Sequence, residues 1–236
     1  MKILRTSYLA IVLLGLSIAI YSSSLFSAPT PLDAGVWHSC GIQNDMTVSC
    51  WGANNKSQAT PPSGAFTQVS AGGEHSCGIK ADGTLACWGN NSNGQITPPS
   101  GTYTQLDAGF WHNCAVRTDG TLACWGWNRD GQSSPPTGTF TQVTTGYVHS
   151  CGLKTDGSIV CWGGNSFGQI NAPSGTYSQL SSGYAHNCAI RTDASLDCWG
   201  WNNQGQLAFP LEAFTQISSG GAHSCGIQTN GSTYLL

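Results

Sequence analysis

The stretch that decides the fold runs from Phe66 to Gly101 and reads FTQVSAGGEHSCGIKADGTLACWGNNSNGQITPPSG. It contains an aromatic-Thr-Gln-Val segment, a Gly-Gly-Glu-His-Ser-Cys segment, an Asp-Gly turn, and a Cys-Trp-Gly segment that precedes a polar tail. Its apolar residues do not recur at the 3.6-residue spacing of a helix, and Gly or Pro interrupts it about every ten residues. The stretch therefore predicts short antiparallel strands joined by tight turns.

The same stretch recurs every 37 residues along the chain, without a single insertion. Every His and every Cys falls on this spacing, and the His positions are His38, His75, His112, His149, His186 and His223. A fixed period between about 20 and 50 residues indicates a repeat array. Because the apolar spacing excludes helical repeats, the sequence predicts an all-β propeller of about six blades, each with three or four strands.

The centre of each repeat is predicted to be a β-hairpin with a cross-strand disulfide. If Ala81-Asp82-Gly83 forms a three-residue loop with its glycine in the left-handed conformation, Cys77 lies opposite Cys87. Alternation along the ladder makes this a non-hydrogen-bonded pair, in which opposing side chains approach most closely. The same register predicts one disulfide in each complete blade: Cys40–Cys50, Cys77–Cys87, Cys114–Cys124, Cys151–Cys161 and Cys188–Cys198.

Two hairpins depart from this turn chemistry. The third loop residue is Met46 in the first repeat and Ala194 in the fifth, and neither residue favours a positive φ. A different turn is therefore expected in these two repeats.

The sixth repeat is incomplete. In the common register Cys225 lies opposite Leu235, so this blade lacks the Cys-Trp-Gly strand and the tail. Two alternatives stay open: a reduced last blade, or a longer array of which this chain is a part. An odd cysteine in an exported chain indicates a free thiol or an intermolecular disulfide.

The first 28 residues are predicted to be a signal peptide. Lys2 and Arg5 precede an apolar run at 8–20, and small polar residues then lead to Ala28, although the cleavage site itself stays open. This run is too short for a membrane anchor, which needs about 20 apolar residues. Residues 29–236 then hold the propeller repeats of an exported protein, in the periplasm, at the cell surface or outside the cell. Export places the cysteines in an oxidising compartment.

Charged residues make up only 8% of the chain. Once Lys2 and Arg5 are removed, 6 basic and 11 acidic residues remain, a net charge of −5. An acidic chain of this kind offers no basic patch to a nucleic acid or to an anionic membrane. We therefore expect no nucleic-acid partner and no membrane span after removal of the signal peptide.

The repeat pattern resembles a known family. Gln-Val-x-Ala-Gly-x-x-His-Ser-Cys followed by Asp-Gly-x-Leu-x-Cys-Trp-Gly-x-Asn-x-x-Gly-Gln is similar to the regulator-of-chromosome-condensation repeat, in the short bacterial form shared with a secreted beta-lactamase-inhibitor propeller. The resemblance covers residues 29–236. It implies a β-propeller, usually of seven blades, that grips another protein with the loops of one rim. Guanine-nucleotide exchange, the activity of the family's nuclear member, does not fit an exported acidic chain.

Metal binding and catalysis find little support in the sequence. His38, Cys40 and Cys50 would share one face, but a structural zinc site needs four ligands and disulfide-bonded cysteines bind none. The Gly-x-Ser-x-Gly string at 164–168 lies in a tail, whereas serine hydrolases place it between a strand and a helix. Most Asp residues occupy turns, and the Asn and Gln that recur in every tail are expected to support the loop. We therefore predict no catalytic residue, no metal and no cofactor.

Function is expected where the repeats differ, which is most at the two positions between Gly and His. In a propeller these loops share one rim, and their aromatic residues are Trp37, Phe110, Trp111, Tyr147 and Tyr184. Large aromatic residues on a rigid surface dominate protein interfaces. The alternative is that they pack between adjacent blades. Trp127 and Trp201, in the other connecting loop, form a second candidate patch.

The leading hypothesis is a non-enzymatic, exported β-propeller that binds an unknown protein through this rim, as an inhibitor or a surface adaptor. A carbohydrate-binding propeller, with a glycan as partner, is the alternative, because exposed aromatic residues also stack on sugars. An enzyme is the third option, and no acid-base pair supports it.

Overall fold

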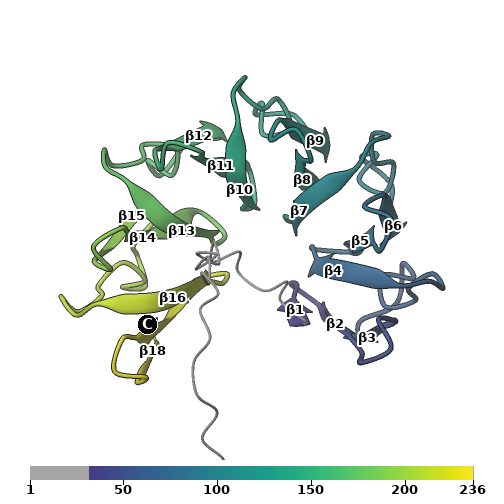
Figure 1. Ribbon diagram of the computed structural model, residues 1–236, viewed down its shortest axis with the longest axis horizontal. Coiled ribbons are helices and arrows are strands. Elements are labelled where there is room, and N and C mark those ends of the chain that lie inside the picture. Colours follow the sequence, from purple (N-terminus) through teal and green to yellow (C-terminus); the bar gives the residue numbers. More distant parts are fainter. Residues whose placement is uncertain (1–31, 236) are drawn as a thin grey trace, which may run out of the picture.

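The computed structural model describes residues 32–235. These residues form eighteen strands in six three-stranded antiparallel sheets, and each sheet is one blade. The blades follow one another in chain order around a central axis (Figure 1). No helix within residues 32–235 is long and apolar enough to cross a membrane. The predicted signal peptide at 1–28 lies outside the described residues.

Every blade has an inner, a middle and an outer strand. The inner strands are β1 (Leu32–Ala34), β4 (Phe66–Ala71), β7 (Tyr103–Ala108), β10 (Phe140–Thr145), β13 (Tyr177–Ser182) and β16 (Phe214–Ser219). The middle strands are β2 (His38–Ile42), β5 (His75–Lys80), β8 (His112–Arg117), β11 (His149–Lys154), β14 (His186–Arg191) and β17 (Ser224–Gln228). The outer strands are β3 (Val48–Gly52), β6 (Leu85–Gly89), β9 (Leu122–Gly126), β12 (Ile159–Gly163), β15 (Leu196–Gly200) and β18 (Thr233–Leu235).

The predicted hairpin register is confirmed. Cys77 lies opposite Cys87 and His75 opposite Gly89 in the second blade. All five predicted disulfides are present, with Cα–Cα distances of 4.0 to 4.1 Å. In the last blade Cys225 lies opposite Leu235, as expected, and its thiol is unpaired.

The prediction of a different turn at Met46 and Ala194 is wrong. These residues have φ values of 66° and 69°, so they adopt the left-handed conformation that Gly83 has in the second blade. The turn keeps its shape because Asp45 accepts hydrogen bonds from the backbone N–H and the hydroxyl of Thr47, as the equivalent Asp does in the other complete blades. A non-glycine residue in this conformation costs about 1 kcal/mol, and the hydrogen bonds that recur in every complete blade offset this cost.

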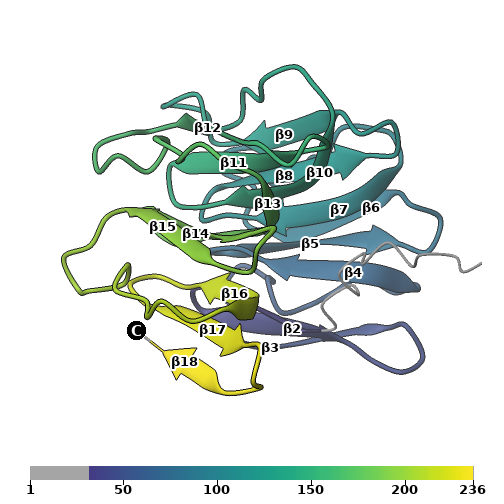
Figure 2. The same ribbon diagram turned by 60° about the vertical axis from the view of Figure 1, so that its left-hand side comes forward.

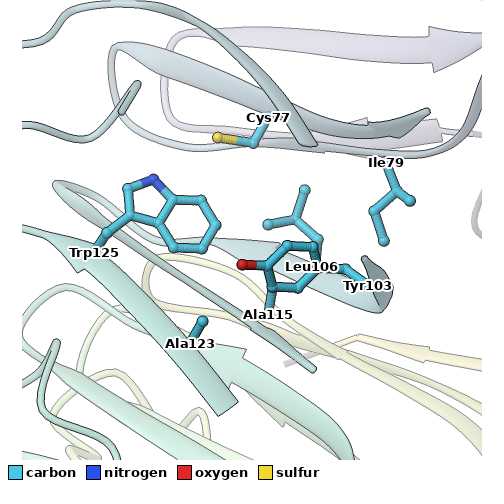
Figure 3. Packing of buried hydrophobic residues seen from close by; sticks show 7 residues of the cluster. All are labelled: Cys77, Ile79, Tyr103, Leu106, Ala115, Ala123 and Trp125. Atoms are coloured by element: carbon cyan, nitrogen blue, oxygen red, sulfur yellow. The ribbon is translucent and has the colours of Figure 1, made fainter. Parts of the chain in front are cut away.

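The hydrophobic core is divided among the interfaces between blades. Figure 3 shows one such interface, in which Trp125 of the third blade packs close to Cys77 of the second. The Trp125 indole N–H also donates to the backbone oxygen of Gln95, in the tail that joins these blades, at 2.9 Å. The fourth and fifth blades repeat this bond, with Trp162 and Trp199 as donors. Packing and hydrogen bonds therefore join each internal blade to both of its neighbours.

The tails are built as the sequence predicts. Gln95 is completely buried, and its Oε1 atom accepts a hydrogen bond from the backbone N–H of Asn93 at 2.8 Å. Asn91 Oδ1 accepts from the backbone N–H of Ile96 in the same tail. The recurring amides thus satisfy backbone groups, which fixes the path of the chain between blades.

Candidate protein-binding rim

All Gly-x-x-His loops lie on one rim, together with the beginnings of the tails. The three strands of a blade are antiparallel, so the outer strand runs back toward the loop that joins the inner and middle strands. The end of the outer strand therefore lies beside this loop, as His75 opposite Gly89 shows. The backbone N–H of Trp127 in the third tail donates to the oxygen of Trp111 in the third loop at 2.9 Å. Trp127 and Trp201, predicted as a separate patch, are therefore on the same rim as the other candidate residues.

Neighbouring loops of this rim are hydrogen-bonded to one another. The N–H of Phe110 donates to Gly146 O, and the N–H of Tyr147 donates to Tyr184 O at 3.0 Å. The first Gly of each loop allows this close approach: a Cβ on Gly72 would lie 2.5 Å from Gly109 O. The loop backbones are thus tied together around the arc before any partner binds.

Four of the five predicted site residues come together and are joined by Trp127. Phe110 contacts both Trp111 and Tyr147, with 4.8 Å between ring centroids in each pair. Tyr147 stacks on Tyr184 at 4.5 Å and lies 6.1 Å from Trp127. We call these five residues, on the third to fifth blades, the aromatic cluster. Tyr184 is 42% exposed and the others are half-buried, so the cluster both packs across blades and presents a surface.

Trp37, the fifth predicted residue, does not join the cluster. It is 60% exposed on the first blade. The second blade, whose loop carries Gly73 and Glu74 at the equivalent positions, separates it from Phe110. The aromatic surface is therefore confined to part of the rim.

A second aromatic pair escaped the sequence analysis. Phe167, 50% exposed, lies 6.1 Å from Trp201 on the neighbouring tail. The signal was present, because the other tails have Lys, Asn, Asp or Gln at the position of Phe167. It was missed because, apart from Trp127 and Trp201, only the recurring Asn and Gln of the tails were considered.

The histidines of the first five blades are structural. The Nε2 atom of each ring forms a hydrogen bond with a Ser or Asn side chain of the next blade. One example is His75, whose Nε2 lies 2.9 Å from Asn113 Oδ1. Burial lowers the pKa of His75 and His149 to about 4 and that of His112 to about 3, so these rings are neutral near pH 7. Within residues 32–235, no group of three or more His, Cys, Asp and Glu is placed to hold a metal ion.

Two carboxylates at the centre of the ring were also missed. The ends of the inner strands surround a polar cavity of about 150 Å³ that Asp33 and Asp107 line. Asp107 accepts hydrogen bonds from the backbone N–H and the hydroxyl of Thr145, both at 2.6 Å. Burial, with the nearby charge of Asp33, raises the pKa of Asp107 to about 7. Both residues precede Ala-Gly at the end of an inner strand, unlike the turn aspartates.

The comparison with known families agrees with this geometry. Residues 66–95, 103–132, 140–169 and 177–206, more than half of the chain, match the regulator of chromosome condensation (RCC1) repeat. The chain belongs to the RCC1 repeat family. A comparison of this RCC1 repeat chain with curated proteins found no match.

Solved structures share the propeller fold. The receptor kinase CR4 ectodomain of Physcomitrella patens is 27% identical, with a TM-score of 0.77 over 87% of this chain and 63% of that one. The CRINKLY WD40 ectodomain of Arabidopsis thaliana ACR4 is 22% identical, with a TM-score of 0.74 over 88% and 81%. Prp20p from Saccharomyces cerevisiae is 16% identical, with a TM-score of 0.76 over 86% and 70%. The RCC1 repeat chain thus spans less than two thirds of the CR4 ectodomain.

Proposed function

We propose that this RCC1 repeat protein is an exported, non-enzymatic scaffold that captures a protein partner through the aromatic cluster. The observation that carries the proposal is the contact of Phe110, Trp111, Trp127, Tyr147 and Tyr184 across three blades. Aromatic side chains held in place lose little entropy on binding, and they are enriched among the residues that dominate interfaces. The five disulfides fit an oxidising compartment.

The similar structures support protein capture as a use of this fold. Prp20 has been crystallised with Kap60 bound, and its binding to Gsp1p and histones is described. CR4 and ACR4 carry their propellers in receptor ectodomains. The present chain shares the fold with these proteins, and its aromatic cluster supplies a surface of its own for a partner.

Capture from the protein's own environment tests the proposal. The immobilised chain and its Trp111→Ala/Tyr147→Ala variant would be exposed to envelope and secreted proteins, and retained proteins quantified by mass spectrometry. Two lost anchors of about 2 kcal/mol each, if additive, weaken binding about 1,000-fold, so the partner should disappear from the variant. Leu211→Ala, a fully exposed leucine outside the cluster, is the matched control. Equal capture by the double variant would refute the proposal.

A glycan is the second candidate partner, and one observation favours it. Phe167 and Trp201 lie in the first parts of their tails (164–171 and 201–207), which contain amides and a hydroxyl but no charged residue. Aromatic rings with neutral polar neighbours suit a neutral sugar. Binding on a glycan array that Trp201→Ala abolishes and Trp111→Ala leaves unchanged would favour this candidate.

A further inference from the structure

The polar cavity at the centre of the ring lies at the same rim as the aromatic cluster. The inner strands surround this centre (Figure 1), and Figure 2 shows them side by side in chain order. The residues that line the cavity come from the ends of these strands, directly before the loops of the rim. Asp107 lies three residues before Phe110, and lining residues of the next two blades precede Tyr147 and Tyr184 at the same spacing. A protein bound to the cluster would therefore have the cavity beside it.

One lining position has the same structural task in four blades. Two residues before the loop glycine, a side-chain oxygen accepts a hydrogen bond from a backbone N–H of the next blade. Ser70 accepts from the N–H of Ala108 at 3.0 Å. Ser181 accepts from the N–H of Ser219 at 2.8 Å. A hydroxyl oxygen is therefore sufficient for this task.

Asp33 and Asp107 occupy the same position with a carboxylate. Asp33 Oδ2 accepts from the N–H of Ala71 at 2.8 Å and from the hydroxyl of Ser70 at 2.9 Å. Both bonds that Thr145 donates to Asp107 end on Oδ2, and Asp107 Oδ1 has no hydrogen-bond partner among residues 32–235. The two carboxylates thus bring a negative charge and a further acceptor that the structural task does not require.

No basic side chain of residues 32–235 forms an ion pair with either carboxylate, because the one ion pair among them joins Arg191 to Asp197. Burial and the charge of Asp33 raise the pKa of Asp107 to about 7. Carboxyl groups with a shifted pKa that lie in a cavity are typical of functional sites. The other polar side chains of the lining are uncharged hydroxyls: Thr144, Thr145, Ser181, Ser182, Ser218 and Ser219. The cavity therefore has the chemistry of a site for a cationic group.

We propose that this cavity binds the ammonium group of a lysine side chain that the protein partner presents, an inference that rests on the proposed function. An ammonium group has three N–H donors, which suit the oxygens of two carboxylates and a hydroxyl. The planar fork of an arginine prefers both oxygens of one carboxylate, and Asp107 Oδ2 already accepts from Thr145. The cavity measures about 150 Å³, whereas one water needs only about 10 to 15 Å³. It therefore has room for the end of a lysine side chain.

A lysine derivative tests the cavity without the partner. The chain would be labelled with ¹³C at the Asp carboxyl carbons and titrated with N-acetyl-lysine methylamide at pH 8, above the pKa of Asp107. The Asp107 resonance, which Asp107→Asn identifies by its disappearance, should shift. N-acetyl-norleucine methylamide, which lacks only the amine, should leave it in place.

Two variants show whether the carboxylate itself binds the lysine derivative. Asp107→Asn should weaken binding, followed at the Asp33 resonance, about 10- to 100-fold, because it removes a charge-assisted hydrogen bond. The variant keeps an acceptor oxygen for Thr145 and so keeps the fold. Asp156→Asn, in an exposed turn, should leave the affinity unchanged.

Capture from envelope and secreted proteins separates this inference from the proposed function. The Asp107→Asn chain should retain at least about 10-fold less of the partner than the wild type. If Trp111→Ala/Tyr147→Ala loses the partner while Asp107→Asn retains it in full, the proposed function stands and the lysine site is wrong. If the lysine derivative binds while the double variant captures normally, the proposed function is wrong and the cavity still binds an ammonium group.

Three results of the titration would overturn the proposal. One is the absence of any shift of the Asp107 resonance with the lysine derivative. Another is an equal shift with the norleucine derivative, which would show that the charge is not recognised. The third is a shift with calcium chloride and none with the lysine derivative, which would make a metal ion the occupant.

Discussion

The Nε2 atom of His149 in the fourth blade lies 2.8 Å from Oδ1 of Asn187 in the fifth. Equivalent contacts join His38 to Ser76 at 2.6 Å and His186 to Ser224 at 2.8 Å. The Nδ1 atoms of these buried rings have no hydrogen-bond partner among the described residues. Each ring therefore holds two blades together as a neutral group, and this relationship makes the stability of the propeller depend on pH.

Acidification should destabilise the protein between about pH 6.5 and pH 4. Burial lowers the pKa of His75, His149 and His186 to about 4, whereas an unfolded chain has the ordinary value of 6.5. A group whose pKa is lower in the folded protein than in the unfolded chain favours the fold at a pH above the unfolded-chain pKa. This contribution to stability is lost as the pH falls through the pKa of the folded protein. Urea unfolding at pH 8, 6 and 4.5 should show a falling free energy of unfolding. Constant stability over this range would contradict the neutral histidines.

Asp107→Asn should change that pH profile in one direction. The pKa of Asp107 is raised to about 7, above its ordinary value of 3.8. The contribution of the protonated Asp107 to the free energy of unfolding is therefore present below about pH 4 and is lost as the pH rises to 7. In the wild type, the pH dependence that Asp107 gives to stability is therefore opposite in sign to that of the histidines. The Asn variant should be more stable at pH 8, on the order of 1 kcal/mol, and its stability should rise more steeply from pH 4 to 7. Asp156→Asn, in an exposed turn, is the control, and an identical profile for the two variants would disprove the assignment.

Gly72→Ala should destabilise the rim strongly. The new Cβ would lie 2.5 Å from Gly109 O and 2.6 Å from His75 Cε1, in a loop that the neighbouring blade holds in place. Such overpacking costs about 1 to 3 kcal/mol, measurable as a lower urea midpoint. Gly221→Ala is the matched control, because nothing lies within 4 Å of its Cβ. Equal effects of both substitutions would show that the loops are not tied together.

Loss of a single disulfide should cost about 2 to 3 kcal/mol, the range for short closed loops. Cys151→Ala/Cys161→Ala removes the bond within the fourth blade, and urea unfolding gives the cost. Cys225→Ser should have little effect, since Cys225 has no disulfide partner. Non-reducing mass spectrometry should find five intramolecular disulfides and one thiol, and any other pairing would contradict the hairpin register.

Local spacing was enough to predict the strands, the register and the disulfides, because opposing residues within a hairpin are fixed by the loop length. Contacts between blades were harder to predict from the sequence. The Phe110–Tyr147 contact joins residues one repeat apart, and its existence depends on the width of the rim. Trp127 was assigned to another patch because the return of the outer strand to the loop rim was not considered. The turn at Met46 shows hydrogen bonds overriding a residue's own preference.

The candidate site was predicted in part. Four of the five residues predicted as the site lie in the aromatic cluster with Trp127, while Trp37 stands apart because the second blade carries Gly73 and Glu74. The central pair Asp33 and Asp107 was overlooked because attention went to the turn aspartates. The likeness to the short bacterial, inhibitor-type propeller and the signal peptide stay predictions.

Site-specific photo-cross-linking tests the central claim most directly. A photoreactive phenylalanine analogue would replace either Tyr184, in the aromatic cluster, or Asp156, in an exposed turn of the opposite rim. The partner recovered by capture should cross-link to the chain modified at position 184 and not to the chain modified at position 156. Cross-linking at position 156 alone would contradict binding through the aromatic cluster.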